Sequence, residues 1–519
     1  MAEPRQSTGT ALQWTGAALP LPASLKLVLA LLLLGSFVVK VGVFAWQPNT
    51  SYADVTMQYL EQAHRLLYGQ GLVTWEFAVG ARSWLVPGLI APGMKLAELL
   101  GGGPQQQVLA AAAVSSLFSL LVVVPCFLWG WRFVGTVGAV VCGALGAFWF
   151  ESVYYAGHPL QDTFGTFFLI PGVYLAYPNG PERDFRRLLA AGFLLGLAVA
   201  FRMQLGPMAA IAALGVARLH PLRYVALGLG GVAGMAILGV LDWITWGVPF
   251  NSIIQYVKYQ GSSIGETGPG KFGFVPWYSY PGWILAYYSG AFALLVVTAL
   301  VGLRRLPLLL VIAVFNVLVL ELVAMKFPRY IYPGVPLVLV LCGIGGSELA
   351  LRLWGGKIRT PVLAAYGFLF VVVTSGLLGA FGYFASHWVL GRGTILATRQ
   401  VNADPAACGL AIAPASAWWL SGGYVFLDRR IPLYGVDAED AGARAQSAGF
   451  NYILSTRETP AETLQSFGTL GYEQVACYAN GTRGPACLWR RPGACTPGAA
   501  QILKASLPDW LDVPKDPAR

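Results

Sequence analysis

The sequence predicts a multi-pass α-helical membrane protein with a small soluble α/β domain at its C-terminal end. Of its 519 residues, 56% are hydrophobic and 11% are charged, whereas a soluble domain carries about 25% charged residues. Long apolar runs recur up to about residue 385, and beyond it the composition becomes that of a soluble domain. We therefore expect an N-terminal tail (1–23), a membrane domain (24–385) and an outer domain (386–519).

The apolar runs predict about eleven membrane crossings, because a helix needs about 20 apolar residues to span a bilayer. The first run is longer than the apolar region of a cleavable signal peptide, so we expect it to remain as a helix. Residues 84–100 are apolar but contain two prolines and a lysine, which favours an interfacial helix rather than a crossing. The predicted crossings are 24–45, 108–131, 134–151, 163–177, 188–201, 205–217, 224–243, 283–303, 306–324, 330–350 and 362–384.

The distribution of Lys and Arg predicts the topology. Basic residues fall in alternate loops, and the intervening loop 152–162 has none. Loops rich in Lys and Arg face the cytoplasm. We therefore expect a protein of the cytoplasmic (inner) membrane whose first loop (46–107), loop 244–282 and C-terminal domain face the periplasm. The net charge of +10 is dispersed along the chain, unlike the basic stripe of a nucleic-acid-binding protein.

The outer domain contains four of the seven cysteines. Strand-like runs around Ile412 and Ile453, and a hairpin pattern over 474–490, predict an α/β fold. Disulfides form in an oxidising compartment, and four cysteines allow three pairings. We favour Cys477 with Cys487 across the hairpin, and Cys408 with Cys495.

The first outer loop carries the strongest candidates for chemistry. Asp54 could deprotonate an acceptor hydroxyl as a general base, or it could cap the helix that begins near Val55. Arg82 could contact a phosphate, or anchor the loop at the interface. The loop also offers residues that could bind a sugar or an acceptor: Gln58, Glu61, Trp75 and Glu76. For Trp75, a place in the interfacial aromatic belt is the alternative.

Two further groups of polar residues lie near the predicted outer face. His158 and Asp162 could hydrogen-bond a sugar or a phosphate, or be ordinary polar loop residues. They are too few for a metal site. Arg202 lies between two short apolar runs, and a charge at membrane depth favours a functional role. A structural ion pair with Asp242 or Glu321 is its alternative.

The later outer loops supply more candidate ligands. Asp242, Trp277 and Tyr278 border or lie within an aromatic-rich loop that could cover a sugar. Lys258 and Lys271 are candidate phosphate contacts. Lys326 and Arg329 suit a lipid phosphate, with snorkelling interfacial anchors as the alternative.

Four ordered patches between residues 45 and 335 resemble glycosyltransferase family 22, the GT-C-fold mannosyltransferases that build dolichol-linked glycans and GPI anchors. These patches are Asp54-Val55-Thr56-Met57-Gln58, the thirty residues that follow it, the loop from Asp242 to Tyr280, and Lys326-Phe327-Pro328-Arg329-Tyr330-Ile331-Tyr332-Pro333. Family members carry Glu where this chain has Val55, which weakens any metal role in that motif. They also carry His and Glu where it has Met325 and Phe327.

The resemblance implies an inverting glycosyltransferase of the GT-C fold, with mannose as the expected sugar. The donor would be a polyprenyl-phosphate sugar, the acceptor a glycan or glycolipid at the outer face, and Asp54 the base. We expect no cofactor. No cytoplasmic loop is large enough to hold a Rossmann-like domain for a nucleotide sugar. A lipid or polysaccharide transporter and a non-catalytic scaffold for envelope assembly are the alternatives. A transporter would be favoured by internal repeats, which we do not find in the sequence.

Overall fold

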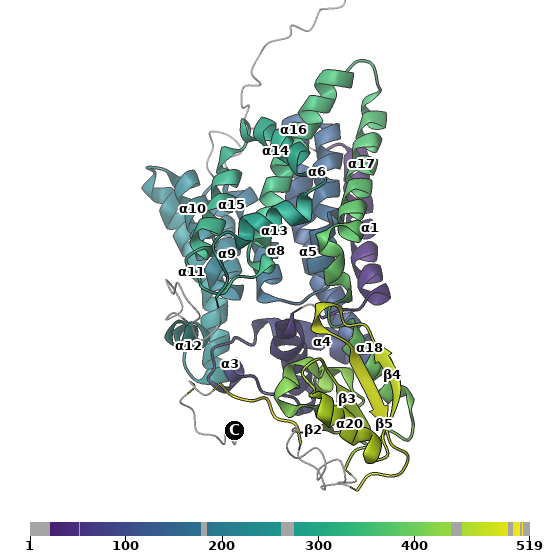
Figure 1. Ribbon diagram of the computed structural model, residues 1–519. Coiled ribbons are helices and arrows are strands. Elements are labelled where there is room, and N and C mark those ends of the chain that lie inside the picture. Colours follow the sequence, from purple (N-terminus) through teal and green to yellow (C-terminus); the bar gives the residue numbers. More distant parts are fainter. Residues whose placement is uncertain are drawn as a thin grey trace, which may run out of the picture.

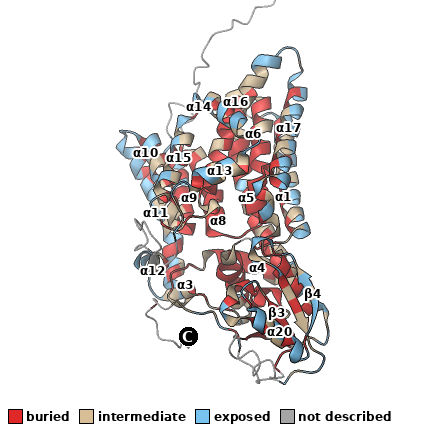
Figure 2. Cartoon of the chain, viewed as in Figure 1, coloured by how far each residue is buried: buried red, intermediate tan, exposed pale blue. Residues whose placement is uncertain are grey.

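The computed structural model describes residues 21–50, 52–177, 184–260, 274–436, 449–496, 502–508 and 511. A body of helices carries a small mixed domain at one end (Figure 1). Figure 2 shows the buried residues inside both parts and exposed residues along the outward sides of the helices. Many of those exposed residues are large and apolar, such as Leu27, Leu31 and Leu34 of α1 (Ala23–Trp46). An apolar outer surface of this extent fits a lipid surrounding.

All eleven predicted apolar runs are helical over most of their length. Within the described part of the chain, five helical stretches are long and apolar enough to cross a membrane, or seven if each of two bent pairs counts as one. The five are α1, α5 (Pro104–Val134), α11 (Pro221–Trp246), the stretch Pro328–Trp354 that contains α16 (Val335–Trp354), and α17 (Thr360–Phe381). The expected count of eleven crossings is therefore not established by helix length.

Two of the predicted crossings are broken helices. Run 134–151 becomes α6 (Thr136–Phe148) and α7 (Phe150–Ala156), which meet at 45° because Trp149 is extended. Run 283–303 becomes α13 (Ser279–Tyr288) and α14 (Phe292–Leu303), which meet at 103°. Ser289-Gly290 lies at this break, and Gly/Ser pairs are a common cause of sharp kinks.

Glycines allow two helices near the site to pack closely. A Cβ on Gly192 of α9 (Phe185–Phe201) would lie 2.2 Å from the carbonyl oxygen of Leu227 in α11. A Cβ on Gly196 would lie equally close to the carbonyl oxygen of Gly231. Small residues at such spacing let the backbones of membrane helices approach each other. This packing fixes α9, which ends directly before Arg202. α8 (Gln161–Ala176) packs against α9, and α10 (Gly206–Ala217) packs against α15 (Pro307–Leu320).

The first outer loop is mostly helical. Its elements are the π-helix η1 (Val55–Leu60), α2 (Glu61–Tyr68), α3 (Trp75–Ala78) and α4 (Leu85–Leu99). The run 84–100 is thus a helix, and α4 packs against α5 and α2. π-Helical turns are rare in proteins, and those that do occur often lie at functional sites. Asp54 precedes η1 and makes no capping hydrogen bond, so the structure does not use it as a helix cap.

The outer domain has the expected α/β fold. Its five-stranded sheet has the order β2-β1-β3-β5-β4, in which β1 is parallel to β2 and β3 and the other pairs are antiparallel. The strands are β1 (Leu410–Ala413), β2 (Leu433–Gly435), β3 (Tyr452–Ser455), β4 (Glu473–Tyr478) and β5 (Ala486–Arg490). Both favoured disulfides are present: Cys477–Cys487 joins β4 to β5, and Cys408–Cys495 closes the domain.

Candidate active site

Asp54 forms an ion pair with Arg329, 275 residues later in the chain. Arg329 belongs to the 3₁₀ turn η4 (Pro328–Tyr330), just before α16. The Arg329 side chain is 4% exposed, whereas that of Asp54 is 29% exposed. A substrate can therefore reach the carboxylate, while the cation behind it is withdrawn from water.

Arg329 also connects Asp54 to a second ion pair. Its Nε lies 3.6 Å from Asp162, and the other Asp162 oxygen lies 3.0 Å from Nε of Arg202. We call these four residues the charge network. Arg202 thus pairs with Asp162, which corrects the alternative that its partner is Asp242 or Glu321. Both side chains of this second pair are 6% exposed.

Arg329 does not use all of its hydrogen-bond donors within the described part of the chain. Its buried Nε and Nη1 have no hydrogen-bond partner among the described residues, although Nε is close to Asp162. Buried polar groups are nearly always hydrogen-bonded, so each exception needs an explanation. A guanidinium can bind phosphate through two donors at once, which makes Arg329 a candidate phosphate-binding residue.

Aromatic rings surround the cations of the charge network. The Arg329 guanidinium lies 4.5 Å from the centroid of Tyr52 and 5.3 Å from that of Tyr330. The Arg202 guanidinium lies 4.9 Å from the same Tyr330 ring. Cation–π contacts of this kind stabilise a partly desolvated Arg. Sequence reasoning did not assign roles to Tyr52 and Tyr330, although they lie only two residues from Asp54 and one from Arg329.

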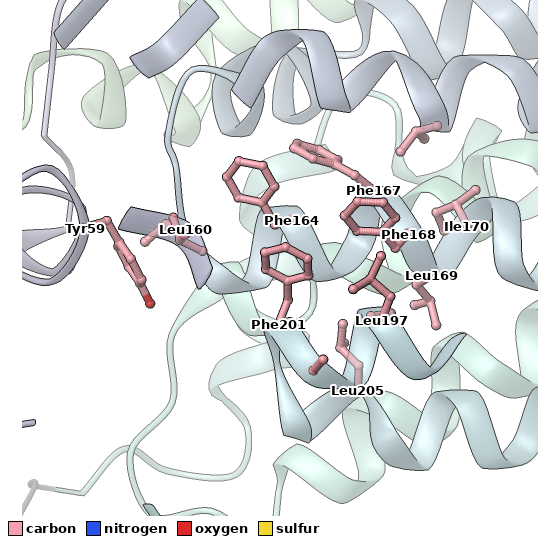
Figure 3. Packing of buried hydrophobic residues seen from close by; sticks show 14 of the residues in the cluster. Tyr59, Leu160, Phe164, Phe167, Phe168, Leu169, Ile170, Leu197, Phe201 and Leu205 are labelled. Atoms are coloured by element: carbon pink, nitrogen blue, oxygen red, sulfur yellow. The ribbon is translucent and has the colours of Figure 1, made fainter. Parts of the chain in front are cut away.

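Packed phenylalanines fix the helix ends that carry Asp162 and Arg202. Figure 3 shows Phe164 and Phe168 of α8 beside Phe201 of α9. Each of these two rings stacks on Phe201, and each centroid lies 5.4 Å from the centroid of the Phe201 ring. Phe164 follows Asp162 by two residues and Phe201 directly precedes Arg202. The aromatic cluster therefore positions the buried ion pair.

A second group of polar residues holds Asp54 from the other side. Gln58 Nε2 lies 3.4 Å from Asp54 Oδ1 and donates to Glu76 over 2.6 Å. Arg82 donates from Nε to Gln58 over 2.9 Å and from Nη1 to Gln161 over 3.3 Å. Gln58, Glu76 and Arg82 are all buried. These contacts fix the amide of Gln58, which in turn limits the movement of Asp54.

The cations around Asp54 control its ionisation. Burial by itself raises the pKa of the Asp54 carboxyl. The charges of Arg329, Arg82 and Arg202 outweigh this effect and hold the pKa below its usual value. Arg82 also lines a cavity of about 30 Å³, together with Gln161, Gln204 and Tyr256, which is room for about one water molecule. The site thus combines an ionised carboxylate with several fixed cations.

Three residues that the sequence predicted to bind a sugar or an acceptor make contacts within the protein. Glu61 is fully buried and accepts hydrogen bonds from the backbone N–H groups of Leu72, Tyr424 and Val425. His158 bonds to the Tyr154 carbonyl and to Asn49 through its two ring nitrogens. Asp242 accepts from the backbone and hydroxyl of Ser252. None of the three belongs to the charge network.

The remaining predicted residues also lie apart from the charge network. Lys326 is buried, donates to the carbonyls of Val323 and Val275, and lies 3.7 Å from Glu321. Lys258 is exposed on α12 (Asn251–Gln260). Trp75 packs against Tyr259, while Trp277 and Tyr278 are 70% and 60% exposed. Lys271 lies outside the described residues.

Comparison with known proteins identifies the family. Residues 32–400 match the model of the Alg9-like mannosyltransferase family. No curated protein sequence matches the chain. Two solved structures of ArnT from Cupriavidus metallidurans are similar in fold. One is bound to undecaprenyl phosphate (TM-score 0.56, 13% identity) and one is in the apo state (TM-score 0.58, 14% identity).

Each of these matches covers 90% of this chain and 98% of the ArnT chain. The similarity therefore includes the outer domain as well as the helical body. The family match covers well over half of the sequence. The protein is thus a multi-pass membrane glycosyltransferase with the GT-C fold, and it belongs to the Alg9-like mannosyltransferase family.

Proposed function

We propose that the protein transfers mannose, with inversion at the anomeric carbon, from a polyprenyl-phosphate donor to a glycan or glycolipid at the outer face of the cytoplasmic membrane. The observation that carries this proposal is the position of Arg329. It contacts the carboxylate of Asp54, and two of its buried donor atoms have no hydrogen-bond partner among the residues that the structure describes. A base and a phosphate-binding group thereby belong to one site, which could hold the acceptor and the donor close together.

In this reaction Asp54 takes the proton of an acceptor hydroxyl. The hydroxyl oxygen attacks the anomeric carbon from the side opposite the phosphate, and the bond from that carbon to the phosphate oxygen breaks. Arg329, with Arg202 and Arg82 close by, stabilises the charge that develops on the leaving phosphate. Gln58 keeps the Asp54 carboxylate in place.

The donor phosphate would also make Asp54 a better base. Arg329 lowers the pKa of Asp54, and a weaker base takes a proton less readily. A phosphate bound to Arg329 would offset its positive charge, so the pKa of Asp54 would rise when the donor is present. The undecaprenyl phosphate in the ArnT structure supports this class of donor.

The proposed orientation rests on the distribution of charge. Figure 1 shows the connection from α16 to α17 at the end of the helical body opposite the outer domain. This connection carries Arg352, Lys357 and Arg359, and basic loops face the cytoplasm. Asp54 and the outer domain would then face the periplasm.

The test is transfer of radiolabelled mannose from a polyprenyl-phosphate donor by membranes that contain Asp54→Asn. We expect activity to fall by about 10²–10⁴-fold, the contribution of a positioned general base. Asp184→Asn is the matched control, because Asp184 caps the start of α9 through the backbone of Arg186, whereas Arg202 follows the end of this helix. It should keep wild-type activity. Retention of more than a few per cent of activity by Asp54→Asn would exclude Asp54 as the base.

A further inference from the structure

A second cavity, of about 220 Å³, lies between the first outer loop and the outer domain. Residues from α2, from the connection of α4 to α5, and from the segment after η8 (Tyr424–Phe426) line it. The polar lining residues are His64, Tyr68, Glu98, Gln107, Asp428 and Arg429. No residue of the charge network lines this cavity, so it is a separate feature of the molecule.

The polar groups of the cavity are held in place by one another. Glu98 accepts from the Tyr68 hydroxyl over 2.9 Å and from Arg429 over 2.7 Å. The Tyr68 hydroxyl also lies 3.2 Å from Gln107. The Arg429 guanidinium lies 4.5 Å from the centre of the Tyr68 ring. The cavity therefore offers donors and acceptors in a pre-organised arrangement, which reduces the entropy lost on binding.

His64 adds an acceptor to this lining. Its Nδ1 lies 2.8 Å from the Gln70 carbonyl oxygen, which can only accept, so Nδ1 carries the proton. Burial lowers the pKa of His64 and keeps the ring neutral. Nε2 then has a lone pair, to which a ligand hydroxyl could donate.

One wall of the cavity is backbone without side chains. Gly101, Gly102 and Gly103 form this wall, and Gly101 has a φ of +84°. A Cβ on Gly102 would lie 2.7 Å from the Ala97 carbonyl oxygen. Glycine at position 102 thus allows the chain to turn tightly against the end of α4. Gly101 and Gly103 are exposed, so this wall presents peptide groups and no side chains.

This lining matches the chemistry of a sugar. Each sugar hydroxyl both donates and accepts hydrogen bonds, and the cavity supplies carboxylate, guanidinium, amide and imidazole groups in a small space. A lipid chain would cover these polar groups without offering them hydrogen bonds, which is unfavourable. The cavity also lies close to the base along the chain. Asp54 precedes η1, and α2, which carries His64, follows η1 directly.

We propose that this cavity binds a hexose unit of the acceptor glycan, away from the hydroxyl that reacts at Asp54. The proposal rests on the proposed function, since it assumes a glycan acceptor. The outer domain would then take part in substrate binding, because Asp428 and Arg429 belong to it.

The test is saturation-transfer difference NMR on the full-length protein in a detergent without a sugar headgroup. Mannotriose, maltotriose and isomaltotriose serve as probes. We expect at least one to bind to the wild type and to Asp54→Asn. Binding should be at least about tenfold weaker in Arg429→Ala and Gln107→Ala, as expected when a hydrogen bond to a charged or buried group is lost. Gln107 lies in the first turn of α5, where alanine preserves the helix.

Arg399→Ala is the matched control. Arg399 donates to Gln105 across the same junction but does not line the cavity, so this variant should bind the sugar normally. Three results would overturn the proposal: no probe binds the wild type, both cavity variants bind like the wild type, or Asp54→Asn abolishes binding. Failure of the proposed function would appear instead as mannose transfer by Asp54→Asn, which is measured separately.

Discussion

Glu61→Gln tests whether Glu61 attaches the outer domain or binds sugar. One carboxylate oxygen accepts from Leu72 N over 2.8 Å and Tyr424 N over 3.1 Å, and the other accepts from Val425 N over 2.9 Å. Glutamine replaces one oxygen by an NH₂ group, so at least one buried backbone N–H loses its acceptor. A buried donor left without an acceptor costs about 1–3 kcal/mol. We therefore expect the contact between Glu61 and the outer domain to open about 5- to 150-fold more often.

Hydrogen exchange at the amides of Tyr424 and Val425 measures this opening, and acceptor KM is measured in parallel. Gly423→Ala is a second way to disturb the contact, because a Cβ there would lie 2.5 Å from a Glu61 oxygen. Glu462→Gln, at an exposed position of α20 (Ala461–Thr469), is the control. Unchanged exchange with a raised acceptor KM in Glu61→Gln would refute the attachment role. It would restore the sugar-binding role that the sequence predicted.

Two more predictions concern the base and the disulfides. Arg329→Gln removes the nearest cation from Asp54, so the pKa of Asp54 rises. Because Asp54 must be ionised to accept a proton, the acidic limb of the plot of kcat/KM against pH should move to higher pH. An unshifted limb would show that Asp54 is not the base. Removal of Cys408–Cys495, with its sequence separation of 87, should destabilise the outer domain by about 4–5 kcal/mol, against about 3 kcal/mol for Cys477–Cys487, with a separation of 10. Denaturant unfolding of the paired serine variants measures both, and equal losses would contradict the loop-length argument.

The sequence was informative wherever the signal is local. Apolar runs predicted where helices lie, and the hairpin pattern predicted the Cys477–Cys487 pair. Helix breaks were missed, because counting apolar residues ignores a single extended residue such as Trp149. The break after Tyr288 did have a signal, since Ser289-Gly290 is a pair that favours kinks.

The site was predicted as a set of residues but not as an arrangement. Asp54, Asp162, Arg202 and Arg329 were all singled out, yet nothing in the sequence indicates that Arg329 lies between the two carboxylates. Their contacts join segments up to 275 residues apart. The internal role of Glu61 was harder to foresee, because its partners are backbone N–H groups, which every residue except proline carries.

The contacts of Arg329 indicate how a donor phosphate would fit the charge network. Arg329 pairs with Asp54 and its Nε lies 3.6 Å from Asp162. Its Nε and Nη1 have no hydrogen-bond partner in the part of the chain that the structure describes, and a buried polar group without a partner is unfavourable. A donor phosphate would supply the missing acceptors. Under the proposed function, therefore, binding of the donor should stabilise the charge network as well as begin the reaction.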